Sequence, residues 1–127
     1  MQYSLAADRT NQAMSILYTP THPSVIRLIQ LVVLQAKQQN IPVTVCGEIA
    51  ADPRFTLLLL GLGVQELSMS TRYIPIIKDT IRNASIIDCV ALAEKVLCLS
   101  TPSEIEKLLN EEYQKHMPAG VEQHAFL

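Results

Sequence analysis

The chain has 127 residues, of which 49% are apolar and 17% are charged, so it can bury the core of one domain. Its 10 basic and 12 acidic residues give no electrostatic reason to expect nucleic acid or an anionic membrane as a partner. The longest apolar stretches are far shorter than the roughly 20 residues that cross a bilayer, and the N-terminus lacks a basic segment followed by an apolar one. We therefore expect a cytoplasmic protein without a membrane span.

The first part of the chain, residues 1 to 21, has no sustained hydrophobic period, and we interpret it as a connector. From Ser24 the apolar residues recur at helical spacing, which predicts an amphipathic helix that fades near Asn40. Pro42 forbids continuation of that helix. The β-branched run from Val43 to Cys46 then predicts a short buried strand.

A helix is predicted after this strand, because Asp52 can cap free amides and Pro53 suits the first helical position. Its apolar run extends to Leu60 and stops at Gly61-Leu62-Gly63. A second short strand is predicted from Glu66 to Met69. The order strand, loop, helix, strand follows from these patterns.

Three helices complete the predicted pattern. Ser70 and Thr71 offer caps for a helix that holds four isoleucines between residues 74 and 81. Two amphipathic helices follow, from Ser85 to Leu99 and from Pro102 to about His116. Thr101 and Glu104 have the spacing of a capping box for the last one.

The alternation of strands and helices is typical of an α/β fold, in which crossover helices pack outside parallel strands. Two short parallel strands cannot close a sheet, and an isolated pair leaves hydrogen-bonding edges and apolar faces open. We therefore expect residues 1 to 117 to be part of a larger α/β domain. Residues 118 to 127 carry no pattern and are expected to be a frayed tail.

The chain contains three cysteines and no CxxC pair, which favours reduced thiols over a disulfide framework or a zinc site. Cys46 lies at the carboxyl end of a strand, where α/β folds bind ligands, and Gly47 allows a ligand to approach the backbone. By spacing alone, such a cysteine is more often a small buried apolar residue than a catalyst. Cys89 and Cys98 lie among apolar residues of a predicted helix, and we interpret both as core residues.

Other polar residues give weaker signals. Arg9 could hold a phosphate or carboxylate through two parallel hydrogen bonds, although a surface ion pair is the commoner role. His22 precedes a helix start, where capping or solvent exposure is the favoured role, and His116 and His124 lie near the end of the chain. Glu48 is a lone carboxylate and gives poor support for a cation site. We assign no metal site to this chain.

Two groups of motifs carry a resemblance to a known family. The first comprises Gln2 to Arg9, Leu17-Tyr18 and His22 to Ile29. The second comprises Val45 to Pro53, Leu57 to Gly61, Glu66 to Ser70 and Ile74 to Lys78. Together they cover Gln2 to about Leu109 and resemble the phosphoenolpyruvate-binding domain of enzyme I of the bacterial phosphotransferase system. Pyruvate phosphate dikinases and phosphoenolpyruvate synthases share a Cys-Gly-Glu segment and are the second interpretation.

The resemblance implies a (β/α)₈ TIM barrel that binds phosphoenolpyruvate and magnesium at the carboxyl ends of its strands. A histidine on a separate domain of the parent protein receives the phosphoryl group and passes it to the phosphocarrier protein for sugar uptake. Arg9 resembles the family arginine that holds the substrate phosphate, and Cys46 resembles the residue that protonates the enolate methylene. The family also implies a homodimer formed through this barrel.

Some family features are absent from the chain. Ala51 stands where the family usually has glycine, which restricts the loop without removing the acid. The chain starts after the Asn-Asp pair that the family uses for substrate and magnesium, and it lacks the earlier magnesium-binding glutamate, the upstream arginines and the phosphorylated histidine. We therefore expect a fragment of the phosphotransferase that is inactive alone. Two other interpretations are a dimerisation module without activity and a small thiol protein that uses Cys46 in redox chemistry.

Overall fold

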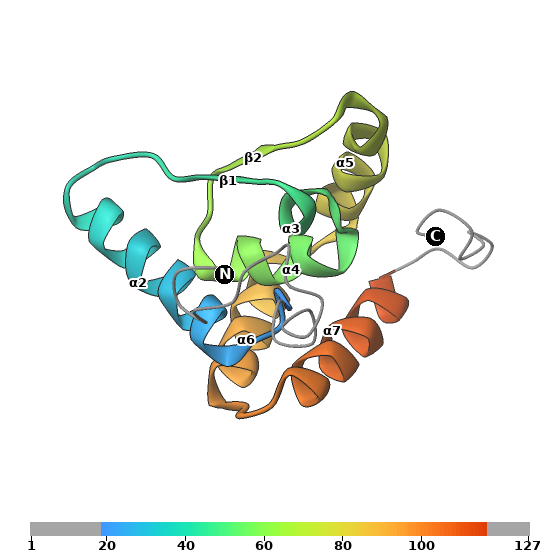
Figure 1. Cartoon of the computed structure of the whole chain (residues 1–127). Helices are drawn as coiled ribbons and strands as arrows, with labels where there is room; N and C mark the ends of the chain where they lie inside the picture. Colours follow the sequence, from blue (N-terminus) through green and yellow to red (C-terminus); the bar gives the residue numbers. More distant parts are fainter. Residues whose placement is uncertain (1–18, 117–127) are drawn as a thin grey trace, which may run out of the picture.

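The structure is a computed structural model, and it describes residues 19 to 116 (Figure 1). Most of the predicted connector, the candidate Arg9 and the predicted tail lie outside the described residues. The elements, in chain order, are α2 (Pro23–Gln38), β1 (Thr44–Cys46), α3 (Glu48–Ala51), α4 (Pro53–Leu62), β2 (Glu66–Ser68), the 3₁₀ helix η2 (Thr71–Tyr73), α5 (Ile74–Asn83), α6 (Ile86–Cys98) and α7 (Pro102–His116). The structure is helix-rich, and every helix and strand expected between residues 24 and 116 is present.

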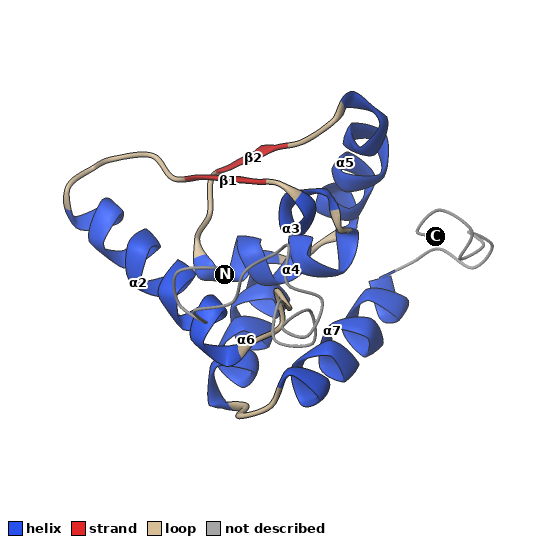
Figure 2. Ribbon diagram, in the orientation of Figure 1, coloured by secondary structure: helices blue, strands red, loops and turns tan. Residues whose placement is uncertain are grey.

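Strands β1 and β2 are parallel neighbours, and the chain between them passes through α3 and α4 (Figure 2). In the register of the pair, Thr44 lies opposite Glu66 and Cys46 lies opposite Ser68. The Thr44 hydroxyl donates a hydrogen bond to Glu66 Oε2 over 2.5 Å. A parallel pair joined by a helical crossover confirms the predicted α/β class.

The prediction that β1 is a buried strand is wrong for the described part of the chain. Val45 and Leu67 pack against the hydrophobic core, whereas Thr44, Cys46 and Glu66 are exposed. Successive side chains of a strand point to opposite faces of the sheet. The helices lie on one side of the pair in Figures 1 and 2, so only that face is covered by described residues.

The core is built around α4, which contacts α2, α5, α6 and α7. Leu57, Leu58 and Leu59 are successive residues of this helix, and none is more than 2% exposed. Successive helical residues point about 100° apart, so their common burial requires partners on several sides of α4. The buried hydrophobic residues outside α4 are Val25, Ile26, Val33, Ala50, Val64, Ile77, Cys89, Leu92, Ala93, Val96, Ile105 and Leu109.

Several predicted helix ends are confirmed. Asp52 Oδ1 accepts a hydrogen bond of 3.0 Å from the Arg54 amide at the start of α4. The capping box of α7 is closed by Glu104 Oε2, which accepts from the Thr101 amide over 3.2 Å and from its hydroxyl over 2.7 Å. His22 Nδ1 accepts from the Ser24 amide and caps α2.

Two predicted boundaries differ from the structure. A 3₁₀ turn precedes α5, and Ser70 makes no side-chain capping bond there. Helix α4 continues past Leu60 and ends at Leu62, and its C-cap is Gly63, whose φ of 90° is in the left-handed region. Gly61 therefore lies inside the helix, and its role is steric: a Cβ there would lie 2.0 Å from the Cys89 carbonyl oxygen of α6.

Among residues 19 to 116, no helix has the length and apolar character that a bilayer requires.

We predict that Gly61→Ala destabilises the chain, because the new methyl group would overlap the α6 backbone, which cannot rotate away. The expected loss in the free energy of unfolding is about 1 to 3 kcal/mol, measured by urea denaturation. Gln35→Ala, at an exposed position of α2, is the control and should change stability by less than about 0.5 kcal/mol. An unchanged urea midpoint for Gly61→Ala would contradict the close contact between α4 and α6.

We predict that Thr56→Val stabilises the chain. The Thr56 hydroxyl oxygen is buried and has no hydrogen-bond partner among residues 19 to 116, whereas valine fills the same space without a polar atom. An unsatisfied buried hydroxyl costs about 1 to 3 kcal/mol, so the thermal midpoint should rise. A lower midpoint would show that the hydroxyl has a partner in solution.

Candidate functional site

The site lies at the edge of the sheet where both strands end. Cys46 ends β1, and its register partner Ser68 ends β2, so parallel pairing places the two side by side. A hollow of about 670 Å³ opens at this edge. Its lining comes from the segment that joins β1 to α4 and from the segment that follows β2: Cys46, Gly47, Glu48, Ala51, Asp52, Arg54, Ser68, Met69, Ser70, Arg72 and Tyr73. The sequence predicted a site at this edge, and the structure places a polar hollow there.

Cys46 is exposed, which excludes its interpretation as a small buried core residue. The chain turns sharply at Gly47, whose φ of 80° and ψ of −158° suit only glycine. No atom lies within 4 Å of the position of a Cβ on Gly47, so the backbone angle and not a lack of space requires glycine there. The exposed thiol therefore belongs to the last residue of β1 and lines the hollow.

Arg54 was not predicted from the sequence patterns, and its guanidinium group lies beside the Asp52 carboxylate. Its Nε is 3.0 Å from each carboxylate oxygen, and its Nη2 is 2.5 Å from Oδ2. This hydrogen bond, with the negative charges of Asp52 and Glu106, raises the pKa of Arg54, although burial opposes the shift. The Asp-x-Arg spacing at a predicted helix start was the only available signal, because its other partner, Asn110 of α7, is distant in sequence.

A second arginine, Arg72, also lines the hollow. Its Nη2 donates a hydrogen bond of 2.7 Å to the Tyr73 hydroxyl, and its guanidinium carbon lies 4.6 Å from the centroid of that ring. Both contacts are at the surface. The hollow is thus lined by a thiol, hydroxyl groups, two carboxylates and two guanidinium groups.

The other candidate residues have different positions. Arg9 and His124 lie outside the described residues. His22 caps α2, and His116 Nδ1 lies 2.8 Å from the Glu112 carbonyl oxygen, so neither faces the hollow. Glu48 lines the hollow. Across residues 19 to 116, no three His, Cys, Asp or Glu side chains are grouped so that they could hold a metal ion.

The other two cysteines lie on α6, away from Cys46. Cys89 is buried as predicted, whereas the prediction for Cys98 is wrong, because Cys98 is exposed. Cys98 follows Cys89 by nine residues, which places the two side chains about 180° apart around the helix. One of them therefore faces α4 and the other faces away from it.

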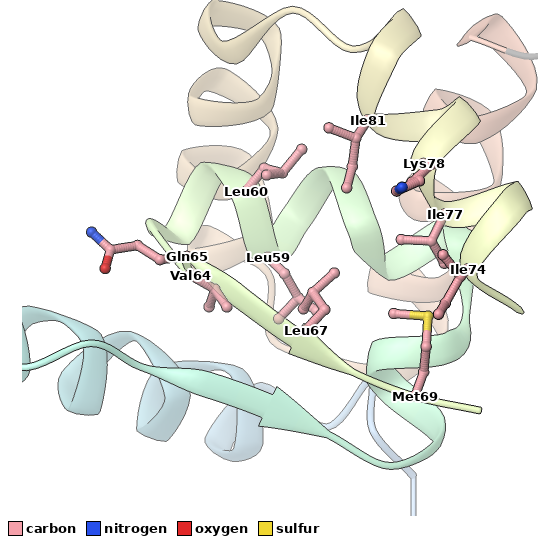
Figure 3. A pocket seen from close by; sticks show the side chains of 10 residues that line it. All are labelled: Leu59, Leu60, Val64, Gln65, Leu67, Met69, Ile74, Ile77, Lys78 and Ile81. Carbon is pink, nitrogen blue, oxygen red and sulfur yellow. The ribbon is translucent and has the colours of Figure 1, made fainter. Parts of the chain in front are cut away.

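A second hollow is apolar and lies between the end of α4, β2 and α5 (Figure 3). It measures about 270 Å³. Leu59, Leu67 and Ile77 converge in it, and Met69 and Ile74 lie at one end. Ile81, also in the lining, is 40% exposed, so an apolar surface continues outward from the core on this side of β2.

Comparison with known proteins establishes the family. Residues 1–86 match the family described as "PEP-utilising enzyme, PEP-binding domain". The chain belongs to this family, which confirms the resemblance given by its motifs. The family description says that the domain binds phosphoenolpyruvate.

Several curated proteins of known name are similar to most of this chain. Over 110 residues the chain is 46% identical to phosphoenolpyruvate-protein phosphotransferase of Haemophilus influenzae, which covers 87% of this chain and 19% of that protein. It is 43% identical over 115 residues to the Mycoplasma genitalium protein of the same name, covering 91% of this chain and 20% of that protein. Multiphosphoryl transfer protein 1 of Escherichia coli is 42% identical over 108 residues, covering 85% and 13%. The chain thus spans about a fifth of the phosphotransferases it matches.

We predict that the three thiols differ in reactivity. Burial, and secondarily the charge of Asp88, raises the pKa of Cys89, while Cys46 and Cys98 are exposed. Iodoacetamide at mildly alkaline pH, followed by peptide mass spectrometry, should label Cys46 and Cys98 in the folded chain and Cys89 only after denaturation. Labelling of Cys89 at the same rate would mean that the contact between α4 and α6 opens readily.

Proposed function

We propose that the chain is the C-terminal part of the phosphoenolpyruvate-binding (β/α)₈ barrel of a phosphoenolpyruvate-protein phosphotransferase, in which Cys46 is the proton donor. The observation that carries the proposal is the position of this thiol, exposed at the carboxyl end of β1 in a polar hollow. The relatives' shared name favours this enzyme over a dikinase or a synthase.

The open surfaces of the structure support the barrel. Among residues 19 to 116, nothing covers one face of the β pair, and β2 has β1 as its only neighbour in the described sheet. The apolar hollow between β2 and α5 (Figure 3) is where a further β/α unit of a barrel would pack. The parent protein would supply that unit, since the relatives are about five times as long as the matching segment.

The proposed chemistry assigns one proton to Cys46. When the phosphoryl group of phosphoenolpyruvate moves to a histidine of the parent protein, the P–O bond breaks and the enolate of pyruvate remains. The enolate carbon takes the proton of the Cys46 thiol, forming the methyl group of pyruvate and leaving a thiolate. Water can reprotonate this thiolate, because Cys46 is exposed. General acid catalysis of this kind contributes about 10² to 10⁴ in rate.

Substrate and metal binding rest on the parent protein. By its resemblance, Arg9 would hold the substrate phosphate through a bidentate contact. Magnesium would be bound by parent residues, because residues 19 to 116 supply no suitable cluster of ligands. The phosphocarrier protein would receive the phosphoryl group from the histidine of the parent's N-terminal domain, and we place the whole reaction in the cytoplasm.

A second function, in dimer formation, is favoured by the exposed apolar residues of α6. Ile86, Ile87 and Val90 are 60%, 77% and 41% exposed. An apolar group of this kind on a surface is typical of a contact with another protein surface. We propose that it belongs to the homodimer contact of the parent protein. A redox role for Cys46 is less well supported, since the other two cysteines lie on α6.

We predict that Cys46→Ala in a parent-length protein lowers pyruvate formation by about 10² to 10⁴. The assay contains phosphoenolpyruvate, magnesium and phosphocarrier protein. Cys98→Ala removes an exposed thiol outside the hollow and should leave the rate unchanged. The 127-residue chain alone should form no pyruvate. Turnover by the short chain, or full activity of Cys46→Ala, would contradict the proposal.

A further inference from the structure

The Arg54 side chain joins two parts of the chain that are far apart in sequence. On one side it contacts both carboxylate oxygens of Asp52, the residue that caps α4. On the other side its Nη1 donates a hydrogen bond of 3.2 Å to Asn110 Oδ1 and lies 3.7 Å from Glu106 Oε1, both on α7. The fork of the guanidinium group allows all of these contacts at once.

The carboxylate in this arrangement is fixed from several directions. Asp52 accepts hydrogen bonds from the Arg54 backbone amide and from its guanidinium group. The side chains of Asp52 and Arg54 are only 20% and 38% exposed, so solvent screens the pair less than a surface ion pair. Burial, and then the negative charges of Asp52 and Asp79, raises the pKa of Tyr113 of α7.

The contacts that hold Asp52 also restrain Cys46, because the segment between these two residues is short. Five residues separate Cys46 from Asp52: Gly47 and the single turn of α3. Strand pairing holds the Cys46 end, and within the segment Ala50 is fully buried while its amide donates to the Gly47 carbonyl oxygen over 3.2 Å. Gly47 adds no side-chain restriction, so the direction of the turn depends on what holds its two ends.

We propose that Arg54 is a positioning residue for Cys46: by tying Asp52 to α7, it fixes the segment from Gly47 to Asp52 and thereby the direction of the thiol. The inference rests on the proposed proton-donor role of Cys46. Effective proton transfer requires the donor within hydrogen-bond reach of the reacting carbon, and a displacement of about 1 Å can cost 10²-fold in rate. Helix α7, which carries no catalytic group in this proposal, would then influence catalysis through Arg54.

Four variants separate the contacts. Arg54→Met removes the guanidinium group and keeps an apolar stem, whereas Asp52→Asn keeps a capping side chain and removes its charge. Asn110→Ala and Glu106→Gln weaken only the connection to α7. Arg82→Met is the matched control, because Arg82 is an exposed arginine in the last turn of α5.

The first measurement is hydrogen exchange of the 127-residue chain, which does not depend on any enzymatic activity. We expect Arg54→Met to speed exchange in residues 47 to 54 at least about tenfold, with smaller increases for Asn110→Ala and Glu106→Gln. Exchange in α6 should stay unchanged, as it should throughout Arg82→Met. Unchanged exchange in residues 47 to 54, or an equal increase in every helix, would overturn the inference.

The second measurement is pyruvate formation by the parent-length variants in water and in deuterium oxide. We expect Arg54→Met to lower kcat about 10- to 100-fold with little change in KM. The solvent isotope effect on kcat should rise, because the poorly placed thiol makes proton transfer slower. A simple loss of folded enzyme would lower kcat and leave the isotope effect unchanged, which would overturn the positioning role.

The two measurements also separate this inference from the function on which it rests. If Cys46→Ala retains full activity, the proton-donor role fails and the positioning role fails with it, even where exchange shows the Arg54 contacts. If Cys46→Ala is inactive and Arg54→Met keeps a normal kcat and isotope effect, the proposed function stands and only the role of Arg54 is overturned.

Discussion

The burial of α4 on several sides is the constraint on which the rest of the structure depends. Three successive leucines of this helix are each at most 2% exposed, so other elements must surround it. Helix α6 covers one side of α4, and its backbone comes close to α4 at Gly61. Helices α2, α5 and α7 cover other sides. Because β1 leads into α4 through only a short turn, the placement of α4 also fixes the edge of the sheet at which Cys46 lies.

The N-terminus of α4 combines a structural role with the candidate chemistry. Asp52 caps the helix and receives the Arg54 side chain, and both residues line the hollow that contains Cys46. An interaction that stabilises the helix start therefore also shapes the candidate site. Under the proposed function, this hollow would receive the anionic substrate.

Some surfaces of the described residues are exposed in a way that bears on the proposed barrel. Within residues 19 to 116, the outer face of the β pair is exposed, and so are the apolar residues Ile86, Ile87 and Val90 of α6. The chain spans about a fifth of its phosphotransferase relatives. The exposed surfaces and the short length relative to the phosphotransferases support the proposal that the chain is part of a larger barrel. Other residues of that barrel would bind magnesium, and its surface would form the dimer.

The sequence by itself determined the two strands, the helices α2, α4, α5, α6 and α7, the parallel α/β class, the capping box of α7 and the position of Cys46 at a strand end, but not the short helices α3 and η2. These features depend on local periodicity, turn residues and short spacings. Only the tertiary structure showed that one face of β1 is exposed among the described residues and that the missing Cβ of Gly61 allows the close approach of α6. It also showed that Cys98 is exposed and that Arg54 joins Asp52 to α7. The physical reason is that each depends on which face a neighbouring element covers, or on a contact between residues far apart in the chain, and no local pattern encodes either.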